Sequence, residues 1–282
     1  MTAAPPLPPG SAVRLGRRGR TFVRDTGGPA DAPVVLLLHG WTANADLNWF
    51  ACFDPLQRAG YRVVALDHRG HGRGIRTFRR FRMRDCADDA AALLDELGIA
   101  SATAVGYSMG GAVAQLLWRR HPSRVSGLVL CATAPVFAES DQEKRWFAAI
   151  GALALASRFT PRIAQRAVAG WVLDRRDTET VEWAATELQR NDWTKVLEAG
   201  NALGRFDSRP WLGEIDVPTS VVLTRFDRVV SPRRQRLFAS SIPGARLFVV
   251  DGDLGVVAMQ PGRFVPALVD AVRAVTRRSA RV

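Results

Sequence analysis

A short segment near the middle of the chain, from Thr103 to Gly111, constrains the fold more than any other part of the sequence. It reads Thr-Ala-Val-Gly-Tyr-Ser-Met-Gly-Gly, a β-like run that ends in Gly-x-Ser-x-Gly and opens a helix of small residues. A serine on so tight a strand-to-helix turn needs glycine two residues before it and two after it, because the backbone passes close there. The segment therefore predicts a serine nucleophile, Ser108, above a helix N-terminus that favours developing negative charge.

Short β-like runs alternate with helical segments along most of the chain. The runs cover residues 21–25, 34–38, 62–66, 103–105, 125–130, 217–223 and 247–250. This alternation predicts an α/β fold, a doubly wound and mostly parallel sheet with helices on both faces. With 282 residues, 47% of them apolar, the chain is long enough to bury one large core.

The alternation breaks between residues 135 and 212, where the sequence is helical, rich in alanine and contains five tryptophans. We expect residues 11–134 and 213–282 to form the core, residues 135–212 a helical lid, and residues 1–10 a disordered, proline-rich arm. An insertion of this kind lies near the carboxyl edge of the sheet, where such sheets bind ligands. The tryptophans, Trp146 among them, fit the lining of an apolar substrate pocket and a self-packed lid equally well.

Three motifs, taken in order, resemble the α/β-hydrolase superfamily and, within it, the lid-bearing branch of serine esterases and lipases. They are Val-Val-Leu-Leu-Leu-His-Gly-Trp ending at Trp41, Asp-His-Arg-Gly-His-Gly ending at Gly72, and the segment around Ser108. The resemblance covers nearly the whole chain, from residue 21 to residue 275. It implies an α/β-hydrolase fold with a helical lid and no cofactor.

The resemblance also implies roles for individual residues. Ser108 is the expected nucleophile, and the backbone N–H groups of Trp41 and Met109 are expected to form the oxyanion hole. Trp41 and Tyr107, together with Trp146 of the insertion, are the candidates for substrate binding.

The acid of the expected triad belongs on the loop after the first strand past the lid. There the sequence reads Val-Val-Leu-Thr-Arg-Phe-Asp-Arg-Val-Val-Ser-Pro, and Asp227 is the candidate. The alternative is that Asp227 only forms a turn or caps the helix before Pro232. Asp251 and Asp253 are weaker candidates, because they lie on the wrong loop for this order.

The general base is missing from the position where the resemblance implies a histidine. The chain order Ser…Asp…His places it after the final strand, and the sequence there has Leu254. The four histidines are at positions 39, 68, 71 and 121. Without an imidazole nothing accepts the Ser108 proton, and such a loss typically lowers turnover on the order of 10⁴–10⁶-fold.

Two alternatives to a lost base stay open at this point. His71 could stand in as the base, since its loop opens near the carboxyl edge, or Leu254 could be an accidental or engineered substitution. His39 and His68 are expected to be structural and to hold loops by hydrogen bonds.

Two functions compete on these observations. The first is a serine ester hydrolase lineage for small apolar acyl substrates, with the incomplete triad Ser108, Asp227 and no histidine, and with weak or absent turnover. The second is a non-catalytic protein that binds a small molecule in the lid pocket, as the plant gibberellin receptors do on a similar fold. Lyase or decarboxylase chemistry also requires a base, and epoxide hydrolases and haloalkane dehalogenases have aspartate in place of Ser108.

The composition of the chain limits the kinds of partner and the cellular location that we expect. The net charge of +12 comes from arginines spread along the whole chain, without a nucleic-acid module, so we expect no nucleic-acid partner. Cys52, Cys86 and Cys131 have no metal-binding or disulfide spacing. No apolar run approaches the ~18 residues of a membrane helix, and the first residues do not resemble a signal peptide, so we expect a cytoplasmic protein without a membrane span. The sequence does not predict the oligomeric state.

Overall fold

Eight strands form one sheet in the computed structural model, which describes residues 5–157 and 179–279. Their order across the sheet is β1-β2-β4-β3-β5-β6-β7-β8, with the β1–β2 and β2–β4 pairs antiparallel and the other pairs parallel. The strands are β1 Gly10–Arg14, β2 Arg20–Asp25, β3 Val34–Leu38, β4 Arg62–Leu66, β5 Ala102–Tyr107, β6 Val125–Cys131, β7 Thr219–Thr224 and β8 Arg246–Val250. The predicted doubly wound, mostly parallel sheet is confirmed.

The central strands are buried on both faces, which is why they read as continuous apolar runs. In β3, Leu36 and Leu38 point into one hydrophobic core, whereas Val35 and Leu37 point into the other. Successive side chains of a strand alternate between the two faces of the sheet, so a run without polar interruptions has to be covered on both sides.

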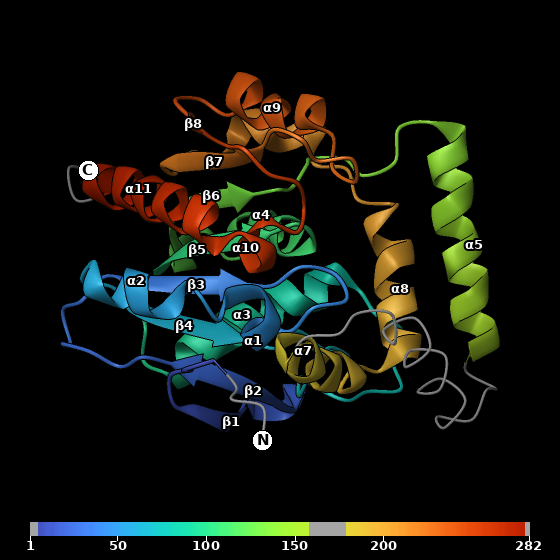
Figure 1. Cartoon of the computed structure of the whole chain (residues 1–282), viewed down its shortest axis with the longest axis horizontal. Helices are drawn as coiled ribbons and strands as arrows, with labels where there is room; N and C mark the ends of the chain where they lie inside the picture. The colour runs from blue at the N-terminus through green and yellow to red at the C-terminus, as the bar shows by residue number, and fades with distance from the viewer. Residues whose placement is uncertain (1–4, 158–178, 280–282) are drawn as a thin grey trace.

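Helices cover both faces of the sheet (Figure 1). Residues of α3, α4 and α9 pack in one core, and residues of α1, α2, α10 and α11 pack in the other. The helices are α1 Ala45–Trp49, α2 Phe53–Arg58, α3 Met83–Glu96, α4 Met109–Arg120, α9 Pro232–Ser241, α10 Val256–Met259 and α11 Pro261–Ser279, with 3₁₀ turns at Gly16–Arg18, Pro122–Arg124 and Arg209–Glu214.

The N-terminal segment differs from its prediction over residues 5–10. Gly10 begins β1, the Pro8 carbonyl accepts a hydrogen bond from Arg24 Nη1 at 2.8 Å, and the Pro9 carbonyl accepts one from Asp25 N at 3.2 Å. Leu7 packs against the second core. A disordered arm is therefore wrong for residues 5–10, because proline lacks a backbone donor but its carbonyl still accepts hydrogen bonds.

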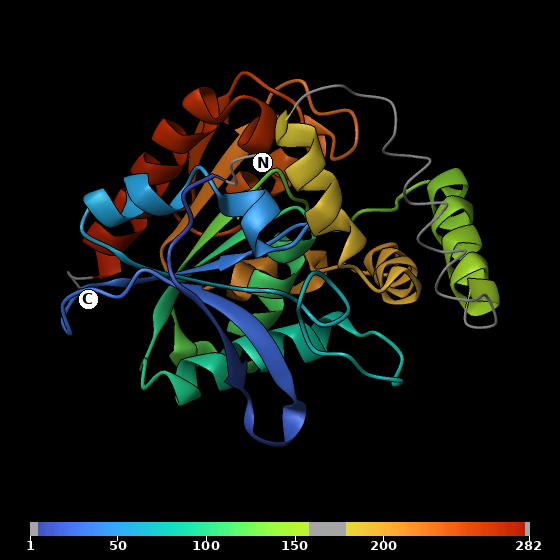
Figure 2. The same ribbon diagram turned by 60° about the horizontal axis from the view of Figure 1, so that its bottom comes forward.

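The insertion is helical where the structure describes it, with α5 Asp141–Ser157, α7 Glu179–Gln189 and α8 Trp193–Leu203. Both views place α8 between the sheet and α5, on the side toward which β3 and β6 point (Figure 1 and Figure 2). Helix α7 contacts the α1 region, where the Trp183 and Phe50 rings meet edge to face at 5.7 Å. Trp171 lies outside the described residues. None of the helices in the described ranges is long and apolar enough to cross a membrane.

Candidate active site

Ser108 lies on a sharp turn between β5 and α4. Its φ of 51° and ψ of −117° are unusual for a residue with a side chain. The flanking glycines allow this turn, because a Cβ on Gly106 would lie 2.3 Å from the Gly110 oxygen, and a Cβ on Gly110 would lie 2.0 Å from the Leu38 oxygen. The turn has the geometry that the Gly-x-Ser-x-Gly pattern predicts.

Hydrogen bonds to β6 and the loop after it hold this turn in place. The Ser108 N–H donates to the Cys131 carbonyl at 2.9 Å, and Thr133 Oγ1 donates to the Ser108 carbonyl at 2.7 Å. The Ser108 residue is 8% exposed. The backbone of the serine is therefore fixed from both sides while its side chain stays at the edge of the sheet.

Two backbone N–H groups beside Ser108 are free to donate. Among the described residues, none accepts a hydrogen bond from the N–H of Trp41 or from that of Met109, the first residue of α4. Gly40 brings the Trp41 peptide close to the serine, since a Cβ on Gly40 would lie 3.4 Å from Ser108 Cβ. These are the two groups for which the sequence predicts the oxyanion hole, and the placement is compatible with that role.

His39 fixes the direction of the Trp41 N–H. His39 Nε2 accepts from the His68 N–H at 2.9 Å, so the ring proton is on Nδ1, which donates to the Gly40 carbonyl at 2.8 Å. The Gly40 carbonyl and the Trp41 N–H belong to one planar peptide, and fixing one orients the other. Burial, and then the neighbouring His68 and His71, hold the pKa of His39 well below its usual value. The hydrogen bonds expected of the His39 ring are present, whereas those expected of His68 are not, since neither of its ring nitrogens has a partner among the described residues.

The Trp41 side chain contacts the insertion. Its Nε1 donates to the Val196 carbonyl of α8 at 2.7 Å, and its ring packs so closely on Gly200 that a Cβ there would lie 2.5 Å from Trp41 Cζ2. The Trp146 ring of α5 meets the Trp41 ring edge to face at 6.3 Å and is itself 54% exposed. The substrate contacts predicted for Trp41 and Trp146 stay predictions.

Asp227 follows β7 and is a buried carboxylate without a cation. One oxygen accepts from the N–H groups of Val229 and Val230, both at 2.8 Å, and the other accepts from Thr224 Oγ1 at 2.9 Å. No lysine, arginine or histidine in the described residues pairs with it. Burial raises the pKa of Asp227 against these hydrogen bonds, and the nearby Asp253 raises it further. The site thus contains a carboxylate whose charge no cation in the described part of the chain balances.

Leu254 follows β8 and lies between the two hydrophobic cores. Its side chain is half-buried and packs against both of them, while its carbonyl accepts a hydrogen bond from Tyr107 Oη at 2.7 Å. Because Tyr107 precedes Ser108, this bond ties the serine turn to the loop of Leu254. No feature of the sequence predicts this hydrogen bond.

Tyr107 itself is part of the core. The residue is 3% exposed, and its hydroxyl donates its hydrogen bond to the Leu254 carbonyl. Its ring meets the rings of Trp49 at 6.0 Å and Phe264 at 5.6 Å, both edge to face. This placement argues against the substrate contact predicted for Tyr107. The side chain points to the face of the sheet that α11 covers, away from the other core.

The other histidines are not joined to Ser108. His71 Nδ1 contacts the Arg69 carbonyl at 3.1 Å, and its Nε2 has no partner among the described residues. Burial lowers the pKa of His68 to about 3 and that of His71 to about 4. His121 bonds to Asp88 at 2.8 Å at the far end of α4. In the described ranges, no three His, Cys, Asp or Glu side chains are arranged to hold a metal ion.

The chain order and the strand order bring the candidate residues to one edge. Ser108 follows β5, Asp227 follows β7 and Leu254 follows β8, and these parallel strands lie on the same side of β3. Neighbouring strands are about 4.8 Å apart, so the ends of β5 and β7 are separated by about 10 Å.

Comparison with known proteins identifies relatives along most of the chain. A family model described as alpha/beta hydrolase fold matches residues 33–254. The non-heme chloroperoxidase CPO-A1 of Kitasatospora aureofaciens is 31% identical over 86% of this chain and 90% of that protein. A pimeloyl-[acyl-carrier protein] methyl ester esterase of Neisseria meningitidis is 33% identical over 79% of this chain and 86% of the relative. A hydrolase from Pseudomonas aeruginosa PA01 has a similar structure, with a TM-score of 0.76 at 26% identity, over 93% of this chain and 98% of that one.

Proposed function

The chain belongs to the alpha/beta hydrolase family, and we propose that it is an ester hydrolase for small apolar acyl substrates whose Ser108 centre lacks its base and turns over slowly or not at all. In this proposal Ser108 is the nucleophile, Asp227 is the acid, and Leu254 occupies the position of the histidine. Residues 135–212 act as the lid over this centre. The lineage agrees with relatives that include a methyl ester esterase and a chloroperoxidase.

One observation carries the proposal. Asp227 is a buried carboxylate with three hydrogen bonds and no cationic partner among the described residues, at the edge of the sheet where Ser108 lies. Burying an unpaired carboxylate is costly, and a neighbouring imidazolium would reduce that cost. A buried acid of this kind, after a strand of the same sheet as a strained serine turn, is expected of a triad that has lost its middle member.

The remaining groups support the first half of an acyl transfer. An ester whose carbonyl oxygen faces the N–H groups of Trp41 and Met109 would present its carbon to Ser108 Oγ. Attack transfers the hydroxyl proton to a base, and the leaving alcohol needs that proton back. Water is a poor acceptor for it. The centre is thus suited to binding an ester and poorly suited to cleaving it.

The test is to restore the imidazole. Leu254→His should raise the hydrolysis of short acyl esters by on the order of 10² or more, because in this proposal the base is the only member of the catalytic machinery that is missing. The Tyr107 bond to the backbone of residue 254 does not depend on its side chain, so the loop should keep its position. Leu254→Asn is the matched control, being polar and of similar size but without a base, and it should stay near the parent rate. Ser108→Ala in the restored protein should remove the gain.

Two results would contradict this proposal. A parent chain that hydrolyses esters at about 1 s⁻¹ or faster, as ordinary enzymes do, would show that another residue supplies the base. A restored protein that stays inert, with a parent that binds an apolar ligand tightly, would show a pocket remodelled for binding. The non-catalytic binding protein would then be the better account.

A further inference from the structure

A cavity of about 590 Å³ has no residue of the candidate active site among the described residues that line it. It lies between the loop that leads into α3, the middle of α4, the C-terminal half of α8 and the segment before the last 3₁₀ turn. Leu116, which lines the cavity, is about 12 Å along α4 from Ser108, at the helical rise of 1.5 Å per residue. The cavity is therefore distinct from the candidate active site, and a ligand in it would be independent of the proposed function.

Four arginines without an acid partner surround this cavity. Arg80, Arg82 and Arg84 come from the loop and the first turn of α3, and Arg205 comes from the segment after α8. All four are exposed, and none forms an ion pair within the described residues. Arg209, by contrast, forms an ion pair with Asp207 at 2.6 Å. Like charges gathered in a concave site favour an anionic ligand.

The acidic residues of the lining do not offset these charges. Glu198 is buried and accepts from Lys195 Nζ at 3.0 Å and from the Phe81 N–H at 2.7 Å. Asp207 forms an ion pair with Arg209. The positive charge of the four arginines is therefore not neutralised by these two carboxylates of the lining, because both have other partners.

The cavity also has an apolar wall. Trp211 lines it beside Leu116, and the ring of Trp211 is stacked on Trp118 at 6.1 Å with an interplanar angle of 22°. The Trp211 ring is half-buried, and besides Trp118 it meets the Arg119 guanidinium, whose Cζ lies 5.6 Å from the ring centroid. An aromatic wall beside guanidinium groups suits a ligand with both a planar apolar part and an anionic part.

Size separates the possible anions. A single inorganic phosphate would leave most of a 590 Å³ cavity empty, whereas small organic molecules bind in clefts of about 300–1,000 Å³. Guanidinium groups bind phosphate oxygens in pairs, and four of them match two phosphate groups. We propose that this cavity binds a nucleotide-class ligand, with its phosphates on Arg80, Arg82, Arg84 and Arg205 and its base against the wall of Trp211.

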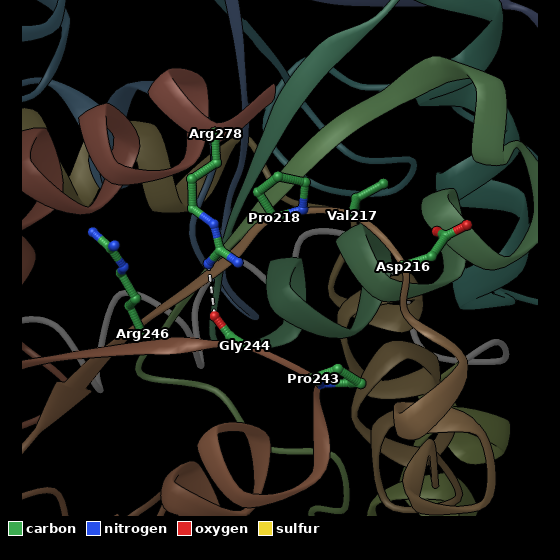
Figure 3. Close-up of a pocket in the computed structure, with 7 residues that line it drawn as sticks. All are labelled: Asp216, Val217, Pro218, Pro243, Gly244, Arg246 and Arg278. Atoms are coloured by element: carbon green, nitrogen blue, oxygen red, sulfur yellow. Dashed lines mark hydrogen bonds between the residues drawn. The ribbon is translucent and has the colours of Figure 1, made fainter. Parts of the chain in front are cut away.

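Another cavity, of about 660 Å³, supplies the control (Figure 3). It lies at the amino end of β7 and also contains two arginines. Arg278 Nη1 donates to the Gly244 carbonyl at 2.7 Å, and Asp216 Oδ1 accepts from Trp118 Nε1 at 3.0 Å. With one arginine engaged and an acid in the lining, this cavity is a weaker anion site. Arg246 is its exposed arginine and serves as the matched control position.

The experiment is calorimetric titration of the whole chain with adenosine 3′,5′-bisphosphate at low salt. We expect saturable one-to-one binding that weakens as salt is added. The double variant Arg80→Gln with Arg205→Gln should weaken the affinity about tenfold or more, while Arg246→Gln should change it less than about twofold. All of these positions are exposed, and matching melting temperatures would show that the variants fold.

Other arms of the titration can overturn the proposal. Equal losses in the double variant and in Arg246→Gln would show that only the net charge attracts the ligand. Pyrophosphate that binds as tightly as the bisphosphate would contradict the role of the Trp211 wall. Binding of an acidic polypeptide or RNA without binding of the bisphosphate would show a docking surface for a macromolecule instead.

Discussion

The contact between Gly200 and Trp41 joins the insertion to the predicted oxyanion donor, and replacing Gly200 by alanine tests it. The added Cβ would lie 2.5 Å from Trp41 Cζ2 and 3.1 Å from Ile150 Cγ2, so the first contact is about 1 Å shorter than ordinary van der Waals distance. Overpacking of this kind costs about 1–3 kcal/mol, and losing the bond from Trp41 Nε1 to Val196 adds about 1 kcal/mol. The higher helix propensity of alanine offsets about 1 kcal/mol of this loss in the free energy of unfolding. We expect Gly200→Ala to lower the free energy of unfolding by about 1–3 kcal/mol.

Urea unfolding followed by tryptophan fluorescence measures this change. Gly262→Ala is the matched control, because Gly262 is also helical and nothing lies near its added Cβ, so it should be neutral or slightly stabilising. In a Trp41→Phe background the ring atom that clashes is absent, and the cost of Gly200→Ala should shrink. In the Leu254→His background, Gly200→Ala should also lower kcat more than KM changes, since a displaced Trp41 carries its N–H away from the oxyanion. A Gly200→Ala chain as stable as Gly262→Ala would refute the reasoning.

Two further predictions concern the acid and the tyrosine. Burial raises the pKa of Asp227, so the free energy of unfolding should fall as the pH rises from about 3.8 through the folded-state pKa and the carboxyl group becomes charged. Asp227→Asn should therefore raise the melting temperature at pH 7, and this gain should fade toward pH 4. A variant that loses stability at pH 7 would contradict the prediction. Tyr107→Phe leaves the Leu254 carbonyl without its donor and should lower the free energy of unfolding by about 0.5–1.5 kcal/mol in urea titrations. In the Leu254→His background the same change should also lower kcat, because the loop of residue 254 is no longer hydrogen-bonded to the serine turn. Unchanged stability and unchanged kcat in the Tyr107→Phe chains would show that this bond positions nothing.

The parallel core was predictable from the sequence because its strands are buried on both faces and read as unbroken apolar runs, as β3 does. Strand β1 was missed, since of Gly10–Arg14 only Val13 is even partly buried and no hydrophobic period marks it. Ser108 was predictable because only glycine fits at Gly106 and Gly110, and that requirement is written into the sequence.

Contacts between distant segments were not predictable. The bond from Tyr107 to the backbone of Leu254 leaves no mark in the choice of residue at 254, since any residue offers a carbonyl. The arginines appeared dispersed along the chain, yet the fold brings Arg205 to Arg80, Arg82 and Arg84 around one cavity. Separation in sequence is no measure of separation in space, and net charge alone could not indicate this site.

The missing base at residue 254 is tested most directly by the pH dependence of ester hydrolysis in the parent and in Leu254→His, with the same ester and the same enzyme concentration. We predict that the parent stays near the uncatalysed rate at every pH. The Leu254→His chain should gain a rate that rises through the pKa of an imidazole, which is about 6.5 when unperturbed and higher beside the Asp227 carboxylate. A parent that already shows this sigmoidal rise, and a variant that only scales it, would contradict the account and assign the base to a histidine the chain already has.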